Sequence, residues 1–207
     1  MKNIPLFTSE YGLATLILEE IPTKGLGFII IRSTDNLSGL LSDGVKFCHM
    51  CGAETVYATA EAPIPGYPLA YEILEFSAKK NQLPAPIGDL KLVPITAENQ
   101  DTLLSYYEEA FRNVQGSGQY SKETQDGFLA YVGEKLVGIG AISEGKLEVI
   151  ATLEPGMGYA LATHLLAKIP EEIITLEVSS TNEKALNLYK KLKFSQTAVL
   201  KTYHKIQ

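Results

Sequence analysis

The spacing of apolar residues alternates along the chain between a period of two and a period of three to four. A period of two favours strands, and the longer period favours amphipathic helices. In the first part of the chain the patterns predict strands at 13–19, 27–32 and 55–60 and helices at 37–51 and about 68–80. In the second part they predict strands at 90–95, 128–132, 136–143, 146–152, 173–179 and 196–204 and helices at 97–112, 158–169 and 182–192. Strands and helices are interspersed throughout, which is typical of an α/β protein.

The strongest break in this pattern is the segment 81–88, Asn-Gln-Leu-Pro-Ala-Pro-Ile-Gly. Its two prolines exclude a helix and favour an extended link. We therefore expect an N-terminal domain, 1–85, and a second domain, 86–207. In each half a strand leads to a helix, a second strand, a loop and a second helix, so an internal repeat with diverged copies remains an open interpretation.

The charge balance excludes several classes of protein. Lys and Arg number 18 against 24 Asp and Glu, a net charge of −6, which provides no basic surface for nucleic acid or an anionic membrane. The 45% apolar and 20% charged residues are typical of a globular protein. The longest apolar stretches, 25–31 and 136–142, fall far short of the ~20 residues of a membrane-spanning helix. Residues 1–10 lack the apolar core of a signal peptide, so we expect a cytoplasmic protein.

Two cysteines, Cys48 and Cys51, form a C-x-x-C pair around His49. A structural zinc site takes four ligands, usually from two such pairs, and the sequence has no further cysteine. Both cysteines also fall on the apolar stripe of the predicted helix 37–51, where a free thiol packs as a small apolar residue. We therefore expect no metal site and interpret both thiols as core residues.

A Gly-x-Gly turn joins the predicted strand 146–152 to the predicted helix 158–169. It reads Leu153-Glu154-Pro155-Gly156-Met157-Gly158. At such a junction several backbone N–H groups and the positive end of the helix dipole point at one place. Glycines let a large anion approach this backbone closely. The turn therefore favours a phosphate or pyrophosphate ligand.

Two other phosphate-binding loops are poorer matches. No Gly-Lys-Ser/Thr follows Gly158, so the turn is not a Walker A loop. A dinucleotide-binding fingerprint needs a third glycine, where this chain has Leu161, although Glu177 lies near the position of its acidic residue. The antiparallel character of the hairpin predicted at 128–143 further disfavours the dinucleotide interpretation.

The predicted helix 182–192 carries a second motif. Ser180 and Glu183 have the spacing of a capping box, which predicts the start of the helix. Four residues at i, i+3, i+4 and i+7 form its apolar stripe: Ala185, Leu188, Tyr189 and Leu192. Because Tyr189 has a polar tip, its hydroxyl needs a partner or a cavity.

Together the two motifs resemble those of the GCN5-related N-acetyltransferases (GNAT). That family has Gln/Arg-x-x-Gly-x-Gly/Ala between its fourth strand and third helix, where this chain has 153–158. Its later motif, Asn-x-x-Ala-x-x-Leu-Tyr-x-x-x-x-Phe, is met by Asn182, Ala185, Leu188, Tyr189 and Phe194. The resemblance implies an α/β fold of the GNAT type, a mixed and mostly antiparallel sheet flanked by helices, for 86–207. A smaller α/β domain at 1–85 would precede it, with a degenerate half of the same fold as one interpretation.

The resemblance also implies an activity and a set of site residues. A GNAT enzyme transfers an acetyl group from its cosubstrate acetyl-CoA to a primary amine by direct attack. In many members a tyrosine of the late helix serves the departing thiolate, and in some a glutamate of the fourth strand is the base, roles that the resemblance implies here for Tyr189 and Glu148. The implied cofactor-binding residues are Thr152, Leu153, Gly156, Met157, Gly158, Tyr159, Ala160 and Asn182. The implied partners are a small-molecule amine or a protein amino group, and a homodimer is compatible with the resemblance.

Alternatives remain open from the residues themselves. Glu148 also fits a solvent-facing charge on a half-exposed strand, and Tyr189 also fits a core aromatic. The family's Gln/Arg position is occupied by Leu153, and Glu154 brings a negative charge to the turn. A non-catalytic acyl-CoA-binding or assembly module with a degenerate GNAT fold is therefore the second hypothesis. In 1–85 no Gly-x-Gly precedes the predicted helix, so we expect that half not to bind CoA.

Overall fold

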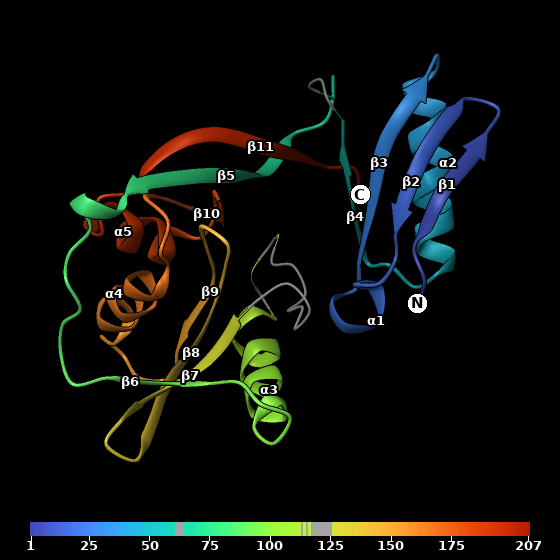
Figure 1. The fold of residues 1–207 in the computed structure, drawn as a ribbon. Coiled ribbons are helices and arrows are strands. Elements are labelled where there is room, and N and C mark those ends of the chain that lie inside the picture. The colour runs from blue at the N-terminus through green and yellow to red at the C-terminus, as the bar shows by residue number, and fades with distance from the viewer. Residues whose placement is uncertain (61–63, 113, 115, 117–125) are drawn as a thin grey trace. The chain divides into compact units, whose positions relative to one another are not determined.

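The computed structural model describes residues 1–207 except 61–63, 113, 115 and 117–125 (Figure 1). The described residues form two compact units, the first made of Met1–Glu72 and Leu200–Gln207 and the second of Ile73–Val199. The domain limits 1–85 and 86–207 stay a prediction.

The first unit is a sheet covered on one face by a helix. Its strands are ordered β1 (Ile4–Ser9), β2 (Gly12–Ile17), β3 (Leu26–Thr34), β4 (Thr55–Thr59) and the end of β11 (Ser195–Lys205). The short α1 (Ile21–Lys24) links β2 to β3, and α2 (Leu37–Met50) links β3 to the parallel strand β4. The predicted stripe of α2 is buried against the sheet, with Leu40, Leu41 and Cys48 fully inaccessible. Both cysteines are free thiols.

The second unit holds the sheet that positions both sequence motifs. Its strands are ordered β11, β5 (Leu69–Lys79), β10 (Ile173–Ser179), β9 (Lys146–Thr152), β8 (Lys135–Ser143), β7 (Asp126–Val132) and β6 (Lys91–Pro94). Its helices are η1 (Lys80–Gln82), α3 (Gln100–Phe111), α4 (Gly158–Lys168) and α5 (Glu183–Lys191). The pairs from β6 to β9 and the pair β5–β10 are antiparallel, whereas β9 and β10 are parallel. This mixed sheet flanked by helices confirms the predicted fold class, while a separate N-terminal domain is not shown.

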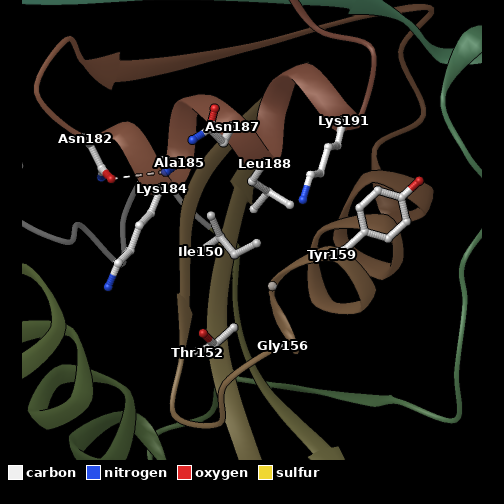
Figure 2. A pocket seen from close by; sticks show the side chains of 11 residues that line it. Ile150, Thr152, Gly156, Tyr159, Asn182, Lys184, Ala185, Asn187, Leu188 and Lys191 are labelled. Carbon is white, nitrogen blue, oxygen red and sulfur yellow. Dashed lines mark hydrogen bonds between the residues drawn. The ribbon is translucent and has the colours of Figure 1, made fainter.

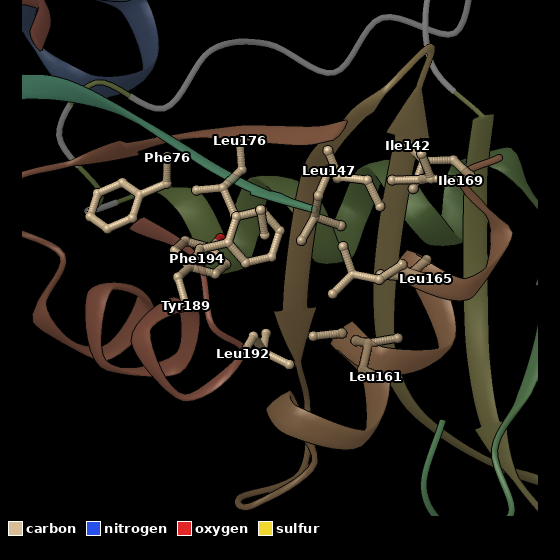
Figure 3. Packing of buried hydrophobic residues seen from close by; sticks show 14 of the residues in the cluster. Phe76, Ile142, Leu147, Leu161, Leu165, Ile169, Leu176, Tyr189, Leu192 and Phe194 are labelled. Carbon is tan, nitrogen blue, oxygen red and sulfur yellow. The ribbon is translucent and has the colours of Figure 1, made fainter. Parts of the chain in front are cut away.

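The two faces of the second sheet are buried against different helices. On one face α4 and α5 pack against the strands through Leu161, Leu165, Ile169, Leu192 and their neighbours (Figure 3). Leu161, Leu165 and Ile169 form the predicted stripe of α4 and are all fully inaccessible. On the other face Leu103 of α3 packs against Leu129 and Ile139. The helices α4 and α5 thus lie on the same side of the sheet, so the two motifs are neighbours.

The two units share one order of connections. In the first, β2 and β3 are antiparallel, and α2 leads from β3 to the parallel β4. In the second, β8 and β9 are antiparallel, and α4 leads from β9 to the parallel β10. An antiparallel strand adds to the last strand in each case, β11 to β4 and β5 to β10. This recurrence is consistent with the internal-repeat hypothesis, which stays a hypothesis.

One predicted helix is wrong. Residues 69–79 form the strand β5, not a helix from about 68 to 80. Its buried residues are Tyr71, Ile73, Leu74, Phe76 and Ala78, so the alternation breaks between Ile73 and Leu74, next to the step from the first unit to the second. A strand with two adjacent buried residues imitates helical spacing, which explains the error. Among the described helices, none is long and apolar enough to cross a membrane.

Candidate functional site

The site is built on a fork between β9 and β10. These parallel strands are in register at Lys146 and Thr175, near their starts, and no further pair of residues is in register although both strands are fully described. The Thr175 amide also donates a hydrogen bond of 2.9 Å to the Gly145 carbonyl at this closed end. The strands then part, and α4 and α5 begin beyond their open ends. Both helix N-termini therefore lie at the mouth of the fork.

A cavity of about 370 Å³ lies at this open end (Figure 2). β9 contributes Ile150 and Thr152, and the turn and first residues of α4 contribute Gly156, Gly158 and Tyr159. The third wall is α5 with its preceding asparagine, which contributes Asn182, Lys184, Ala185, Asn187, Leu188 and Lys191. The structure thus brings together Thr152, Gly156, Gly158, Tyr159 and Asn182 from the predicted binding set.

The turn before α4 leaves its backbone accessible to a ligand. The first N–H groups of any helix have no acceptor within the helix. In α4 the N-cap residue, Met157, does not satisfy them either, because its side chain makes no capping hydrogen bond. Gly156 has a φ of 84°, a left-handed conformation that favours glycine. A Cβ at Gly156 would meet no atom within 4 Å, and one at Gly158 would touch only Leu188, at 3.7 Å. This arrangement suits an anion.

Three residues of the predicted binding set lie outside the cavity lining. The Leu153 amide donates a hydrogen bond of 2.9 Å to the Val137 carbonyl, which extends the pairing of β9 with β8. Met157 packs against the main core of the second unit. Ala160 lies in the first turn of α4, where its carbonyl accepts a hydrogen bond of 2.9 Å from the Thr163 hydroxyl. These residues shape the turn and do not contribute side chains to the cavity surface.

The negative charge of the turn is compensated by a neighbouring strand. Glu154 forms an ion pair of 2.8 Å with Lys135, the first residue of β8. Among the described residues that line the cavity there is no carboxylate, whereas Lys184 and Lys191 are both present. The cavity wall is therefore positively charged, as the ligand predicted from the turn requires.

Asn182 both starts α5 and lines the cavity. It is the N-cap of the helix, and its side chain accepts a hydrogen bond of 3.2 Å from the Ala185 amide. The capping box predicted at Ser180 and Glu183 is therefore wrong, because the asparagine two residues later provides the cap. Asn182 therefore both fixes the start of the helix and forms part of the cavity wall.

Tyr189 lies in the core beside the cavity and does not line it. Its exposed fraction is 6%, and its ring lies 6.2 Å from that of Phe194 between ring centres (Figure 3). Burial raises the pKa of its hydroxyl to about 12, so the group is protonated over the physiological range. The preceding residue, Leu188, is the one that reaches the cavity wall.

Glu148 lies toward the closed end of the fork and outside the cavity lining. The register of β8 with β9 shifts here, from Ala141 opposite Val149 to Ile142 opposite Leu147, which leaves Glu148 as the extra residue of a bulge. Its carboxylate accepts a hydrogen bond of 2.7 Å from the Ser143 hydroxyl and lies 3.4 Å from the Lys146 ammonium.

Lys146 joins this group to the next strand by an ion pair of 2.8 Å with Glu177. Burial lowers the pKa of Lys146, but the carboxylates of Glu177 and Glu148 outweigh it, and the pKa is raised overall. Glu148, Lys146 and Glu177 therefore form a charged cluster at the closed end of the fork.

Sequence reasoning missed the two cavity lysines. Lys184, Asn187 and Lys191 lie at i, i+3 and i+7 on α5, which places them on one helix face. That spacing is visible in the sequence, but a polar helix face is by default interpreted as solvated. Elsewhere, no group of three or more His, Cys, Asp or Glu residues suited to a metal occurs among the described residues.

Comparison with known proteins places the fold. The sequence matches no protein-family model and no curated protein. A functionally unknown conserved protein from Staphylococcus epidermidis is similar in structure, with a TM-score of 0.63, 13% identity and coverage of 96% of this chain and 91% of that one. A GCN5-related N-acetyltransferase from Sphaerobacter thermophilus has a TM-score of 0.57 at 14% identity and covers 93% and 75%. One from Kribbella flavida has a TM-score of 0.56 at 14% identity and covers 100% and 89%. The fold of this chain is therefore GNAT-like.

Proposed function

We propose that this protein is an acyltransferase that moves the acetyl group of acetyl-CoA to a primary amine, of a small molecule or of a protein, in the cytoplasm. The observation that carries the proposal is the cavity of about 370 Å³ between the end of β9, the Gly156–Gly158 turn and α5. It combines open helix N–H groups with a wall whose described residues include two lysines and no carboxylate. A GNAT-like fold around this cavity makes a phosphate-containing acyl donor the best-supported ligand.

The donor would be held mainly by backbone groups. The first N–H groups of α4, at Gly158, Tyr159 and Ala160, would donate to the pyrophosphate. Beyond Lys146, β9 has no residue of β10 in register, although both strands are fully described, so this edge can pair with the amides of the pantetheine arm. Asn182 offers an amide group to the same arm. Backbone donors need no arginine at the position of Leu153.

The chemistry would be one acyl transfer. The neutral amine attacks the thioester carbonyl, a C–N bond forms, the C–S bond breaks, and the amine proton passes to a base. Glu148 is the candidate base, since a carboxylate can take that proton directly or through water. The second requirement is stabilisation of the departing thiolate.

Tyr189 is the candidate partner of the thiolate. Because burial raises its pKa to about 12, well above that of a thiol, it would act as a hydrogen-bond donor and would not give up its proton fully. This role requires its hydroxyl to reach the cavity from the core side of α5.

The test is release of free thiol from acetyl-CoA in the presence of a panel of amines, with Tyr189→Phe as the matched variant. We expect turnover with at least one amine class and a kcat reduced about tenfold to a hundredfold in the variant, with little change in acetyl-CoA affinity. Wild-type turnover that Tyr189→Phe leaves intact would remove Tyr189 from the mechanism.

A non-catalytic acyl-CoA-binding or assembly module is the second candidate function. The observation that favours it is the burial of Tyr189, which leaves its ring in the core and outside the cavity lining. Calorimetry with CoA separates the candidates, since tight binding with no turnover on any amine would favour the module. Absence of CoA binding at millimolar concentration would exclude the acetyltransferase and the acyl-CoA-binding module, and would leave an assembly role.

A further inference from the structure

We propose that Lys191 supplies the cationic contact to the pyrophosphate of the acyl donor, in place of the turn residue at position 153. The inference rests on the proposed function, because it names a specificity-determining residue of that same site. Two helices would then bind the same anion: α4 through its backbone N–H groups, and α5 through the positive charge of Lys191.

The position of Lys191 supports this assignment. It lines the cavity from the last turn of α5, across from the start of α4. In Figure 2 its side chain extends toward the side of the cavity where Gly156 and Tyr159 lie. A Cβ at Gly158 would lie 3.7 Å from Leu188, the neighbour of Lys191 on the same helix face, so the two helices approach closely here. An anion at the start of α4 would therefore lie within reach of the lysine.

The charges around the site favour the same residue. Among the described residues Lys191 forms no ion pair, whereas Lys135 and Lys146 are both held by carboxylates. Its charge is thus available to a ligand. Leu153 cannot provide this contact, because its amide donates a hydrogen bond to the Val137 carbonyl and its side chain carries no charge.

Lys184 is a poorer candidate for this contact. It precedes Lys191 by seven residues, which is about 10 Å along a helix axis at about 1.5 Å per residue. In Figure 2 its side chain extends from the other end of α5, beside Asn182 and away from Gly156. The start of α4 lies nearer to the end of α5 that carries Lys191, so Lys191 is the better placed of the two lysines for an anion held there.

Calorimetric titration of the full chain with CoA and with dephospho-CoA tests the inference. Dephospho-CoA keeps the pyrophosphate and lacks the 3′-phosphate. We expect Lys191→Gln to weaken the binding of both ligands about tenfold or more, as loss of a charge-assisted contact would. Lys191→Arg should restore most of the affinity. The dependence of the wild-type affinity on salt should be steeper than that of Lys191→Gln.

Lys190→Gln is the matched control, since Lys190 is exposed, precedes Lys191 directly and does not line the cavity. Equal affinities for Lys191→Gln and Lys190→Gln would overturn the inference while leaving donor binding intact. Loss of affinity for CoA alone would assign Lys191 to the 3′-phosphate and overturn the pyrophosphate assignment. Failure of the wild type to bind CoA would instead overturn the proposed function together with this inference.

Discussion

Lys135 and Glu154 form an ion pair of 2.8 Å between the first residue of β8 and the turn that follows β9. The pair accounts for how a turn that carries a carboxylate can still serve an anionic ligand. Glu154 lies directly before Pro155 and Gly156, yet it is not among the residues that line the cavity. The partner that neutralises it comes from the adjacent strand, 19 residues earlier by number, and is not part of either sequence motif.

Removal of Lys135 should weaken donor binding without touching the cavity. We expect Lys135→Gln to lower the affinity for CoA about twofold to fivefold, because the uncompensated charge of Glu154 then repels the phosphates. Stability should change by less than ~1 kcal/mol, since both side chains are substantially exposed. Calorimetry at low ionic strength measures the first effect and urea unfolding the second.

A double-mutant cycle separates charge from structure. Lys135→Gln combined with Glu154→Gln should bind CoA at least as tightly as the wild type, because the repelling charge is then absent. A double variant as weak as Lys135→Gln alone would contradict this explanation.

A methyl group at Gly158 should leave the stability of the protein nearly unchanged but weaken the binding of CoA. A Cβ there would make ordinary contact with Leu188 at 3.7 Å, so Gly158→Ala should change stability by less than ~1 kcal/mol. The methyl group would project toward the ligand at the start of α4, and we expect the affinity for CoA to fall about tenfold. Calorimetry and thermal unfolding of the same preparation measure both quantities.

Gly140→Ala is the opposite case and serves as the comparison. A Cβ at Gly140 would lie 2.3 Å from Cδ1 of Leu165 in the core, so this substitution should destabilise the protein by ~1–3 kcal/mol. If Gly158→Ala were destabilising to the same extent, its effect on binding would be attributed to the fold.

The sequence predicts an element correctly where its apolar residues all pack against a single core. The stripe Leu161, Leu165, Ile169 faces one core along its whole length, and α4 appears where the sequence predicts it. β5 has no single core, because Tyr71 belongs to the first unit and Phe76 to the second. Its pattern of apolar residues is set by two different cores, and no local period can describe it.

The candidate site divides in the same way. Gly156 and Gly158 were predictable because backbone geometry before a helix restricts the residue type, whereas Asn182 was indicated by the family motif while the cap was predicted at Ser180. The contribution of Lys191 depends on the approach of α5 to the start of α4, which is a tertiary relation. Burial of Tyr189 depends on Phe194 and the neighbouring strands, so the sequence left its environment open.

Burial of Tyr189 should make stability depend on alkaline pH. The pKa is about 12 in the folded protein against 10.0 in the unfolded chain, so the folded state retains a proton that the unfolded state loses. This stabilisation is fully present below pH ~10 and is lost as pH rises toward ~12. We expect the free energy of unfolding of Tyr189→Phe to fall less steeply between pH 9 and 11, by ~1–2 kcal/mol over that range.

Urea unfolding at several pH values measures this difference. Tyr71 is also buried and its pKa is also raised, so both proteins should share a remaining decline in stability. Parallel pH profiles for the wild type and Tyr189→Phe would show that the Tyr189 hydroxyl is solvated.

Lys193 follows the C-cap of α5, a position where the left-handed backbone conformation favours glycine. Its φ is 72°, a left-handed conformation that costs an L-residue roughly 1 kcal/mol. The Lys193 amide donates to the Lys190 carbonyl at 3.1 Å and the Phe194 amide to the Tyr189 carbonyl at 3.0 Å, the two bonds of a Schellman motif. We expect Lys193→Gly to stabilise the protein by ~0.5–1 kcal/mol, measured by urea unfolding.

Lys193→Ala isolates the cause of this gain. It removes the charge and the flexible chain of an exposed lysine but keeps the Cβ that makes the left-handed conformation unfavourable. Stability should therefore rise in Lys193→Gly and stay within about 0.5 kcal/mol of the wild type in Lys193→Ala. Equal gains in both variants would instead attribute the effect to the lysine charge near Lys190 and Lys191, and the backbone would carry no strain.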